Sequence, residues 1–365
     1  MAIVSRLEGL RKAQSKAGID AMLITELTNI RYLTGFTGSA AVLAVSAQSA
    51  LMVTDGRYRG QAAEQLRASG LEGQINLVIG GGDAQREALL LALADAKRVG
   101  LEADHLSWSA ASRWQERLSG TEVKAISEMV EKLRMVKDAE EIAMMEKAAA
   151  IADAALGEVL EILAGARGPV SERAFALQLD STIRRLGAEG LAFETIVAAG
   201  ENSAKPHHEP SDRQIQPGDS VVVDFGAMYE GYRSDMTRSF SIGGPPKGEM
   251  AEVFAIVLEA QRRGVAAVKA GATTTAIDAA CRDYITEQGY GDAFEHSTGH
   301  GVGLDIHEAP GVGAQEATTL EAGMVVTVEP GIYLSGLGGV RIEDTLVVTE
   351  TGATPLTKFH KDVVL

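Results

Sequence analysis

Short apolar runs alternate with helix-forming stretches over the first third of the chain. Met22-Leu23-Ile24 predicts a buried strand after an amphipathic opening helix, and the polar residues 46–49 predict a turn between two more strands. Gly70 ends one of the expected helices. The expected strands are 22–24, 40–45, 50–54, 75–79 and 98–101, and the expected helices are 57–68 and 88–94. This order predicts an α/β domain.

The pattern changes near Ser127. Strong helix formers then dominate through Leu163, and Asp138 followed by Glu141 has the spacing of a capping box, which predicts that a second helix begins there. We therefore expect an α/β domain over residues 1–127 and a second domain over residues 128–365. Helices are expected in the second domain over 171–186, 249–269 and 275–288. The remainder beyond Gly190 is strand-rich, so this domain is expected to be α+β.

The segment 220–242, SVVVDFGAMYEGYRSDMTRSFSI, reads as strand, turn and strand, with residues 229–231 at the turn. Asp224 and Asp235 are equidistant from its centre, so we expect them to face one another in the hairpin, with Cβ atoms about 5 Å apart. Two partly buried carboxylates at that distance repel each other, and a bound cation removes the repulsion. The hairpin therefore predicts a metal site.

A second segment repeats this arrangement. Residues 324–333 and 340–348 are expected to form the two strands of a hairpin around Gly336, with Glu329 and Glu343 equidistant from that glycine. These carboxylates are also expected to face each other across the ladder. If the two hairpins converge, four carboxylates meet at one place.

A histidine-rich stretch, HSTGHGVGLDIHE, lies between the hairpins. His300 stands between Gly299 and Gly301, which allow close backbone approach to a ligand, and His296 and His307 flank it. Ordinary explanations, a solvated aspartate or a histidine satisfied by its surroundings, predict no matched symmetry in two hairpins. Oxygen-rich ligation with one imidazole suits Mn²⁺, Co²⁺ or Zn²⁺. The joint pattern indicates a two-metal hydrolytic site.

The amino-acid composition limits the classes of partner that the protein is expected to bind and where it is expected to be located. The net charge of −16, from 34 basic and 50 acidic residues, argues against nucleic-acid and anionic-membrane partners. The single cysteine, Cys281, fits a reducing compartment. The longest purely apolar run, 88–94, is far shorter than the roughly 20 residues of a membrane span. A cytoplasmic protein is therefore expected.

The motifs NSAKPHH, VVDFGAMYEGYRSDMTR, HSTGHGVGLDIHE, VTVEPGIY and GGVRIED, in this order, resemble the pita-bread metallopeptidases. The proline-specific branch, Xaa-Pro aminopeptidases (aminopeptidase P) and Xaa-Pro dipeptidases (prolidases), is the most similar. The resemblance covers essentially the whole chain. It implies a creatinase-type α/β N-terminal domain before an α+β pita-bread catalytic domain, and cleavage of the peptide bond before proline in short peptides.

The resemblance also implies a role for individual residues. Two divalent ions, Mn²⁺ first with Co²⁺ or Zn²⁺ as alternatives, would be held by Asp224, Asp235, His300, Glu329 and Glu343, with Asp235 and Glu343 bridging. His207, His296, His307 and Tyr333 would contact substrate, and His207, His307, Glu329 and Arg341 would serve catalysis. His307 would stabilise the developing oxyanion, Glu329 would shuttle a proton, and Arg341 would orient a bridging carboxylate. His208 is expected to be an ordinary residue.

Two questions stay open at this level. Aminopeptidase and dipeptidase actions are equally compatible with the motifs, and a non-catalytic pita-bread scaffold is the alternative from another class. Such scaffolds typically lose metal ligands, whereas all five ligand positions are occupied here. In relatives of this layout the N-terminal domain supports a homodimer and bounds the catalytic cleft. The same arrangement is expected here, with residues 29–39 as a loop-like contributor that includes Arg31, Tyr32 and Phe36.

Overall fold

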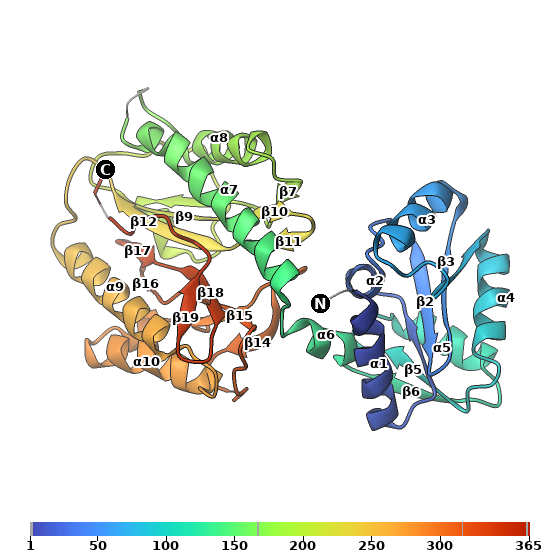
Figure 1. The fold of residues 1–365 in the computed structure, drawn as a ribbon. Coiled ribbons are helices and arrows are strands. Elements are labelled where there is room, and N and C mark those ends of the chain that lie inside the picture. The colour runs from blue at the N-terminus through green and yellow to red at the C-terminus, as the bar shows by residue number, and fades with distance from the viewer. Residues whose placement is uncertain (1–2, 166–167, 316, 363) are drawn as a thin grey trace. The chain divides into compact units, whose positions relative to one another are not determined.

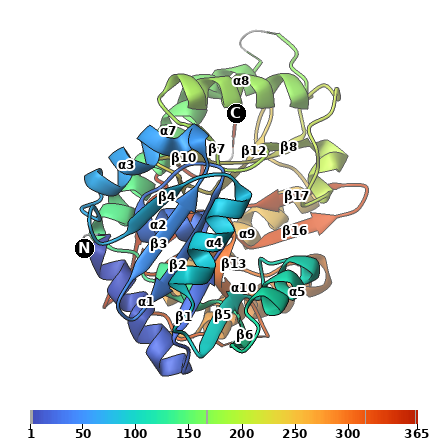
Figure 2. The same ribbon diagram turned by 90° about the vertical axis from the view of Figure 1, so that its right-hand side faces the viewer.

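The computed structural model describes residues 3–165, 168–315, 317–362 and 364–365. The chain divides into two compact units, one ending at Arg134 and the other beginning at Met135 (Figures 1 and 2). The division follows helix α6 (Met129–Arg134), which packs against α1 (Val4–Ala17) and α2 (Leu27–Thr34) of the first unit. No helix within the described ranges is long and apolar enough to span a membrane.

The first unit is built on a six-stranded mixed sheet with the order β4-β3-β2-β1-β5-β6. Its strands are β1 (Ala21–Ile24), β2 (Ala41–Ser46), β3 (Ala50–Thr54), β4 (Asn76–Ile79), β5 (Arg98–Glu102) and β6 (Glu122–Ile126). Its other helices are α1 (Val4–Ala17), α2 (Leu27–Thr34), η1 (Gly56–Tyr58), α3 (Arg59–Ala68), α4 (Gly82–Ala92) and α5 (Trp108–Arg117). The strands expected from the apolar runs are confirmed. Helix α5 and strand β6 were not expected, because their polar surfaces leave no apolar run in the sequence.

The loop-like character expected for residues 29–39 is wrong for the first part of the segment, and its contribution to the cleft stays a prediction. The segment begins inside α2 rather than in a loop, and two of its aromatic side chains are core residues. Tyr32 is 5 % exposed and donates a hydrogen bond to the carbonyl oxygen of Leu133, while Phe36 is 1 % exposed. Because Tyr32 and Phe36 are buried within the first unit, the half-buried Arg31 is the one accessible residue of these three.

Two pairs of helices organise the second unit (Figure 1). The first pair is α7 (Ala139–Leu163) with α8 (Glu172–Arg185), and the second is α9 (Glu249–Ala267) with α10 (Thr274–Glu287). The capping box of Asp138 and Glu141 is present at the start of α7 and confirms that prediction. Each pair covers its own apolar core of buried aliphatic and aromatic side chains. The strands between these helix pairs carry the candidate site.

Small antiparallel sheets make up the β part of this unit, with the strand orders β11-β10-β7, β12-β9-β8, β14-β13-β15-β18-β19 and β16-β17. The first strands are β7 (Gly190–Leu191), β8 (Ile196–Ala199), β9 (Ser220–Phe225), β10 (Ala227–Tyr229), β11 (Tyr232–Arg233) and β12 (Met236–Ser241). The later ones are β13 (Gly299–Gly301), β14 (Glu308–Val312), β15 (Val325–Val328), β16 (Gly331–Leu334), β17 (Gly338–Arg341), β18 (Asp344–Val348) and β19 (Ala353–Pro355). Short 3₁₀ turns are η2 (Gly200–Ala204) and η3 (Gly291–Ala293).

The first hairpin has a different register from the one expected. Asp224 pairs with Thr237, so Asp235 lies two residues away from the position opposite Asp224. The cause is a tight turn at Glu230 and Gly231, which both have positive φ angles of 47° and 77°. Because residues two apart share a face of a strand, Asp235 becomes a diagonal neighbour of Asp224 on the same face.

The second hairpin has the expected register, although its strands are not continuous. Val328 pairs with Asp344, and Gly331 pairs with Arg341, so Glu329 and Glu343 occupy opposed positions between the two ladder segments. Neither glutamate is itself in a strand, because their backbone N–H groups donate to Thr298 and Thr237 instead of to each other. Each expected strand is therefore broken at its carboxylate.

Candidate metal centre

A cavity of about 490 Å³ within the second unit gathers the predicted site residues. Every one of them except Tyr333 lines it. These lining residues are His207, Asp224, Asp235, His296, His300, His307, Glu329, Arg341 and Glu343. Residues separated by more than 130 positions in the chain thus meet at one place, where the two hairpins and β13 converge.

Arg341 at the end of β17 holds one side of the cavity. Its Nη2 donates to Oδ2 of Asp224 at 2.6 Å, and its Nη1 donates to the hydroxyl of Tyr333 at 2.8 Å. Its Nε donates to Oγ1 of Thr237 at 3.1 Å, and that hydroxyl donates to Oε2 of Glu343 at 2.7 Å. One buried guanidinium therefore orients Asp224 directly and Glu343 through Thr237.

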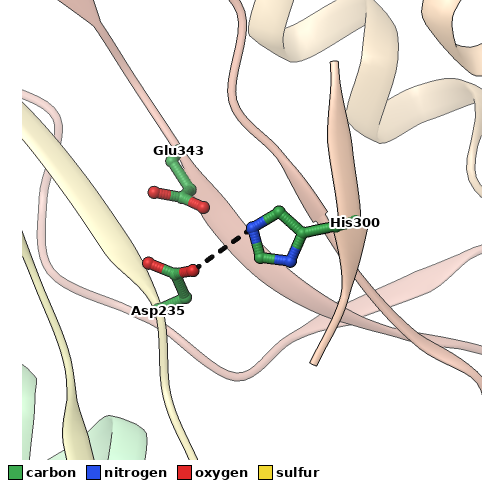
Figure 3. A group of neighbouring side chains, drawn as sticks. All are labelled: Asp235, His300 and Glu343. Carbon is green, nitrogen blue, oxygen red and sulfur yellow. Dashed lines mark ion pairs between the residues drawn. The ribbon is translucent and has the colours of Figure 1, made fainter. Parts of the chain in front are cut away.

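Asp235, His300 and Glu343 converge from three segments, with ligand atoms all within 4.8 Å of one another (Figure 3). Nε2 of His300 lies 3.5 Å from Oδ2 of Asp235 and 3.3 Å from Oε1 of Glu329. Nδ1 of His300 lies 3.0 Å from the carbonyl oxygen of Gly301, so this nitrogen carries the proton and Nε2 presents a lone pair to the carboxylates. Burial lowers the pKa of His300, which keeps the ring neutral.

The glycines beside His300 allow close packing of β13 against its neighbours. A Cβ atom on Gly299 would lie 2.1 Å from the carbonyl oxygen of Thr327, and one on Gly301 would lie 2.5 Å from that of Ala309. Both glycines therefore bring β13 close to its neighbouring chain segments, and their approach to a ligand stays a prediction. His300 is fixed in place as a result, because its own N–H donates to Oγ1 of Thr327 at 3.0 Å.

The carboxyl groups of the cavity resist ionisation together. Burial, then repulsion from neighbouring carboxylates, raises the pKa of Asp235 and of Glu343 well above the usual range. Burial raises the pKa of Glu329 to about 8. Arg341 is the one arginine or lysine among the lining residues, so the described wall of the cavity supplies too little positive charge for four carboxylates. A protonated cluster or a bound cation is required at neutral pH.

Two buried oxygens show that the side chains fit cations. Oδ1 of Asp224 and Oε1 of Glu343 have no hydrogen-bond partner among the described residues, although the large majority of buried polar atoms in proteins have one. Together with the bare Nε2 of His300, they offer hard oxygen and imidazole donors. This donor set suits divalent ions such as Mn²⁺, Co²⁺ or Zn²⁺.

The other histidines lie around this cluster. Nε2 of His296 lies 2.9 Å from the Tyr333 hydroxyl, and burial lowers the pKa of His296 to about 4. The ring of His307 meets the ring of His300 edge-on, with centroids 4.4 Å apart. Burial, then the neighbouring His300, lowers the pKa of His307. His207 is exposed at the cavity wall. Tyr333 reaches the site through Arg341 and His296.

Sequence reasoning missed three residues of this neighbourhood. Thr237 links Arg341 to Glu343, and its position opposite Asp224 follows from the hairpin register. His208, expected to be ordinary, lines the cavity and lies 2.8 Å from Oε2 of the fully buried Glu172. The doubled histidine of the NSAKPHH motif was the one available signal for His208.

Comparison with known proteins decides the family. Residues 143–350 match metallopeptidase family M24, and residues 6–136 match the creatinase/prolidase N-terminal domain. This chain belongs to metallopeptidase family M24. The M24 chain has the two-part architecture implied by the resemblance: a creatinase-type α/β domain followed by an α+β pita-bread domain. Family membership makes it a divalent-metal peptidase, and the cavity described above holds its candidate metal ligands.

Relatives of this M24 chain match it over nearly full length. An Xaa-Pro dipeptidase of Pyrococcus furiosus is 38 % identical over 98 % of this chain and 99 % of its own. The solved structure of an Xaa-Pro dipeptidase from Bacillus anthracis is 43 % identical with a TM-score of 0.93, covering 100 % of both chains. An X-Pro aminopeptidase structure from Thermotoga maritima is 37 % identical with a TM-score of 0.85, covering 97 % of this chain and 100 % of that one.

Proposed function

We propose that this protein hydrolyses the peptide bond preceding proline in short Xaa-Pro peptides, using two divalent metal ions. The observation that carries the proposal is the convergence of Asp224, Asp235, His300, Glu329 and Glu343 on one cavity, with two buried oxygens left unpartnered. Relatives named Xaa-Pro dipeptidase and X-Pro aminopeptidase support the proline preference.

The ligand roles follow from the environment of each side chain. Asp235 and Glu343 would bridge the two ions, a role supported by their burial between the other carboxylates. Asp224 would hold one ion through Oδ1, because Arg341 already occupies Oδ2. His300 and Glu329 would hold the other. When bound, the two cations lower the pKa of a water so that hydroxide is available near neutral pH, and they polarise the scissile carbonyl.

The remaining side chains would guide the substrate and its protons. Neutral His307 can donate a hydrogen bond to the carbonyl oxygen as negative charge develops on it. Glu329, which lines the cavity beside His300, would carry a proton to the leaving nitrogen. Arg341 would keep Asp224 aligned, and His207 would contact the substrate from the cavity wall.

Proline poses a recognition problem that this cavity can meet. The bond before proline has no N–H on its leaving nitrogen, so a peptidase must recognise the ring rather than that donor. The apolar side chains of Phe193, Ile196 and Ile306 in the lining offer surface for such a ring. His296, held against Tyr333, would border the ring as a neutral side chain.

Mn²⁺ is the proposed physiological metal, with Co²⁺ and Zn²⁺ as substitutes, because the donor set is rich in oxygen and has one imidazole. A cytoplasmic location is proposed from the single cysteine. The acidic balance of −16 supports peptide substrates over nucleic-acid or anionic-membrane partners. A homodimer in which the N-terminal domain, residues 1–127, bounds the cleft completes the proposal.

The deciding experiment compares hydrolysis of Ala-Pro with hydrolysis of Ala-Pro-Ala, with Mn²⁺, Co²⁺ and Zn²⁺ each added to metal-free protein. Cleavage of the dipeptide alone identifies a dipeptidase, and release of alanine from both peptides identifies an aminopeptidase. Ala-Ala and Ala-Ala-Ala are the matched controls for the proline requirement. A protein that binds the metals but cleaves none of these peptides would favour the non-catalytic scaffold.

A further inference from the structure

Glu172, the first residue of α8, gathers donors from several chain segments. Oε1 accepts hydrogen bonds from the N–H of Ala199 at 2.8 Å and from Nδ2 of Asn202 at 3.1 Å. Oε2 accepts from the N–H and the hydroxyl of Ser211, at 3.0 and 2.6 Å, and lies 2.8 Å from Nε2 of His208. The side chain is completely buried. A helix cap needs only one such contact, so this carboxylate does more than begin a helix.

These donors bracket the segment that carries His207. Ala199 and Asn202 precede it, whereas His208 and Ser211 follow it. Both ends of the segment 199–211 are therefore tied to a single buried carboxylate.

The opposite side of the same segment is tied to the metal centre. The carbonyl oxygen of Pro206 accepts a hydrogen bond from Nη1 of Arg341 at 3.3 Å, and Arg341 also holds Asp224. His207 thus stands between two anchors, Pro206 on Arg341 and His208 on Glu172. The His207 side chain is exposed at the cavity wall. Its position is therefore set by its neighbours in the chain.

We propose that Glu172 and His208 form a positioning pair that holds the substrate histidine His207 at the cavity wall. The pair acts on substrate binding through the backbone, and neither member needs to touch the substrate. This inference rests on the proposed function for the role of His207, whereas the mechanical link from His208 to His207 stands on the contacts alone.

The charge state of the Glu172 carboxylate suits it to accept these hydrogen bonds at neutral pH. Burial raises the pKa of Glu172, but the hydrogen bonds from Ser211, His208, Ala199 and Asn202 together outweigh burial and bring that pKa below its usual value. The carboxylate stays ionised and accepts from all its donors at neutral pH. Glutamine cannot replace it, because each oxygen accepts from a backbone N–H, of Ala199 or of Ser211, and an amide nitrogen would oppose one of them.

His208 is the better residue to change, since its loss leaves Glu172 with its hydrogen bonds from Ala199, Asn202 and Ser211. We expect His208→Ala to raise KM for Ala-Pro about tenfold with a smaller change in kcat, as loss of uniform substrate binding does. In a His207→Ala background, His208→Ala should change KM for Ala-Pro by less than about twofold, because the effects of coupled residues do not add. His208→Gln, which keeps a donor for Glu172, should restore most of the loss.

His360→Ala is the matched control, because it removes a histidine from an exposed ion pair with Asp362 in the same unit. It should leave KM unchanged. An equal loss for His208→Ala with and without His207 would overturn the proposal, since it would mean a general packing role. Normal kinetics in His208→Ala would overturn it as well.

A crystal structure of His208→Ala tests the link without relying on activity. Pro206 and His207 are expected to shift relative to the unaltered protein, and an unchanged segment would overturn the proposal. If the unaltered protein cleaves no Xaa-Pro peptide, the proposed function fails, yet this structural comparison still decides whether His208 positions His207.

Discussion

Nη2 of Arg341 lies 2.6 Å from Oδ2 of Asp224, and Oδ1 of that aspartate has no hydrogen-bond partner among the residues that the structure describes. One oxygen of the carboxylate is thus fixed, and the other is free to bind a cation. The same guanidinium holds Tyr333 and Thr237. Arg341 is therefore a positioning residue for the metal ligands on both hairpins.

Replacing Arg341 by lysine should lower activity and metal affinity by roughly 10- to 100-fold, as changes to groups that orient metal ligands do. Lysine keeps the charge, but it cannot donate to Asp224, Tyr333 and Thr237 from one rigid fork. Peptide hydrolysis and metal titration measure the two effects. Arg263→Lys, at an exposed ion pair with Glu259, is the control. Equal activity in the two variants would contradict the role.

The metal-free protein should lose stability as pH rises from about 4.5, the ordinary pKa of a glutamate, to about 8. Burial raises the pKa of Glu329 to about 8, so the folded state keeps a proton there that the unfolded chain has already lost. Because the folded state holds a proton that the unfolded chain has released, the free energy of unfolding falls as pH rises through this window. Above the folded pKa the loss is complete, on the order of a few kcal/mol at about 1.4 kcal/mol per pKa unit.

Thermal unfolding of metal-free and metal-loaded protein across this pH range measures that loss. The difference in Tm between the two forms should widen by several degrees towards pH 8, because bound cations remove the repulsion. Glu329→Gln should flatten the pH dependence of the metal-free form. A constant difference in Tm from about pH 4.5 to about pH 8 would argue against the buried carboxyl cluster as its source.

Removing a bridging carboxylate should cost more metal than removing a terminal one. Asp235→Ala is expected to bind fewer ions per protomer than Asp224→Ala, because a bridging group serves both ions. Elemental analysis after dialysis gives the stoichiometry, with the exposed Asp212→Ala as the control. Full occupancy in Asp235→Ala would exclude the bridging assignment.

His307→Ala should retain its metals and lose turnover on the order of 10²-fold, the usual cost of one donor to a developing oxyanion. The His307 ring packs edge-on against the His300 ring, with centroids 4.4 Å apart, and is not one of the five proposed ligands. Metal analysis and kcat for Ala-Pro separate the two effects. A near-normal kcat would remove His307 from the mechanism, and loss of metal would point to a ligand role instead.

The two hairpins show how much of the strand register could be predicted from the sequence. The register of Glu329 and Glu343 follows from the glycine-rich turn, and the structure has it. The register of Asp224 was missed because either Tyr229-Glu230 or Glu230-Gly231 could centre the turn. Only the backbone angles of Glu230 and Gly231 decide between them. A shift of one residue at the turn moves the cross-strand partner by two.

The Glu172 network lay beyond sequence reasoning for a different reason. A glutamate just after Ser171 at the start of a helix has a sufficient local explanation, the favourable interaction of an acid with a helix N-terminus. Its donors at Ala199, His208 and Ser211 are 27 to 39 positions away, the first at the end of β8 and the other two in a loop without periodicity. No pattern of spacing links such residues, whereas the capping box at Asp138 is entirely local and was predicted.

The full chain should be a homodimer in solution, with twice the 38.4 kDa mass of one chain. Residues 1–127 supply none of the proposed metal ligands, yet they are about a third of the chain. A peptidase limited to short substrates needs a wall that excludes longer ones, and this domain is the part of the chain free to provide it.

With Tyr32 and Phe36 buried in their own core, Arg31 and the 85 % exposed Trp108 are the residues to change. Analytical ultracentrifugation gives the mass, and hydrolysis of proline peptides of increasing length gives the size limit. Trp108→Ser and Arg31→Ser should weaken the dimer or relax the limit, whereas a monomeric full chain with a strict size limit would refute the idea.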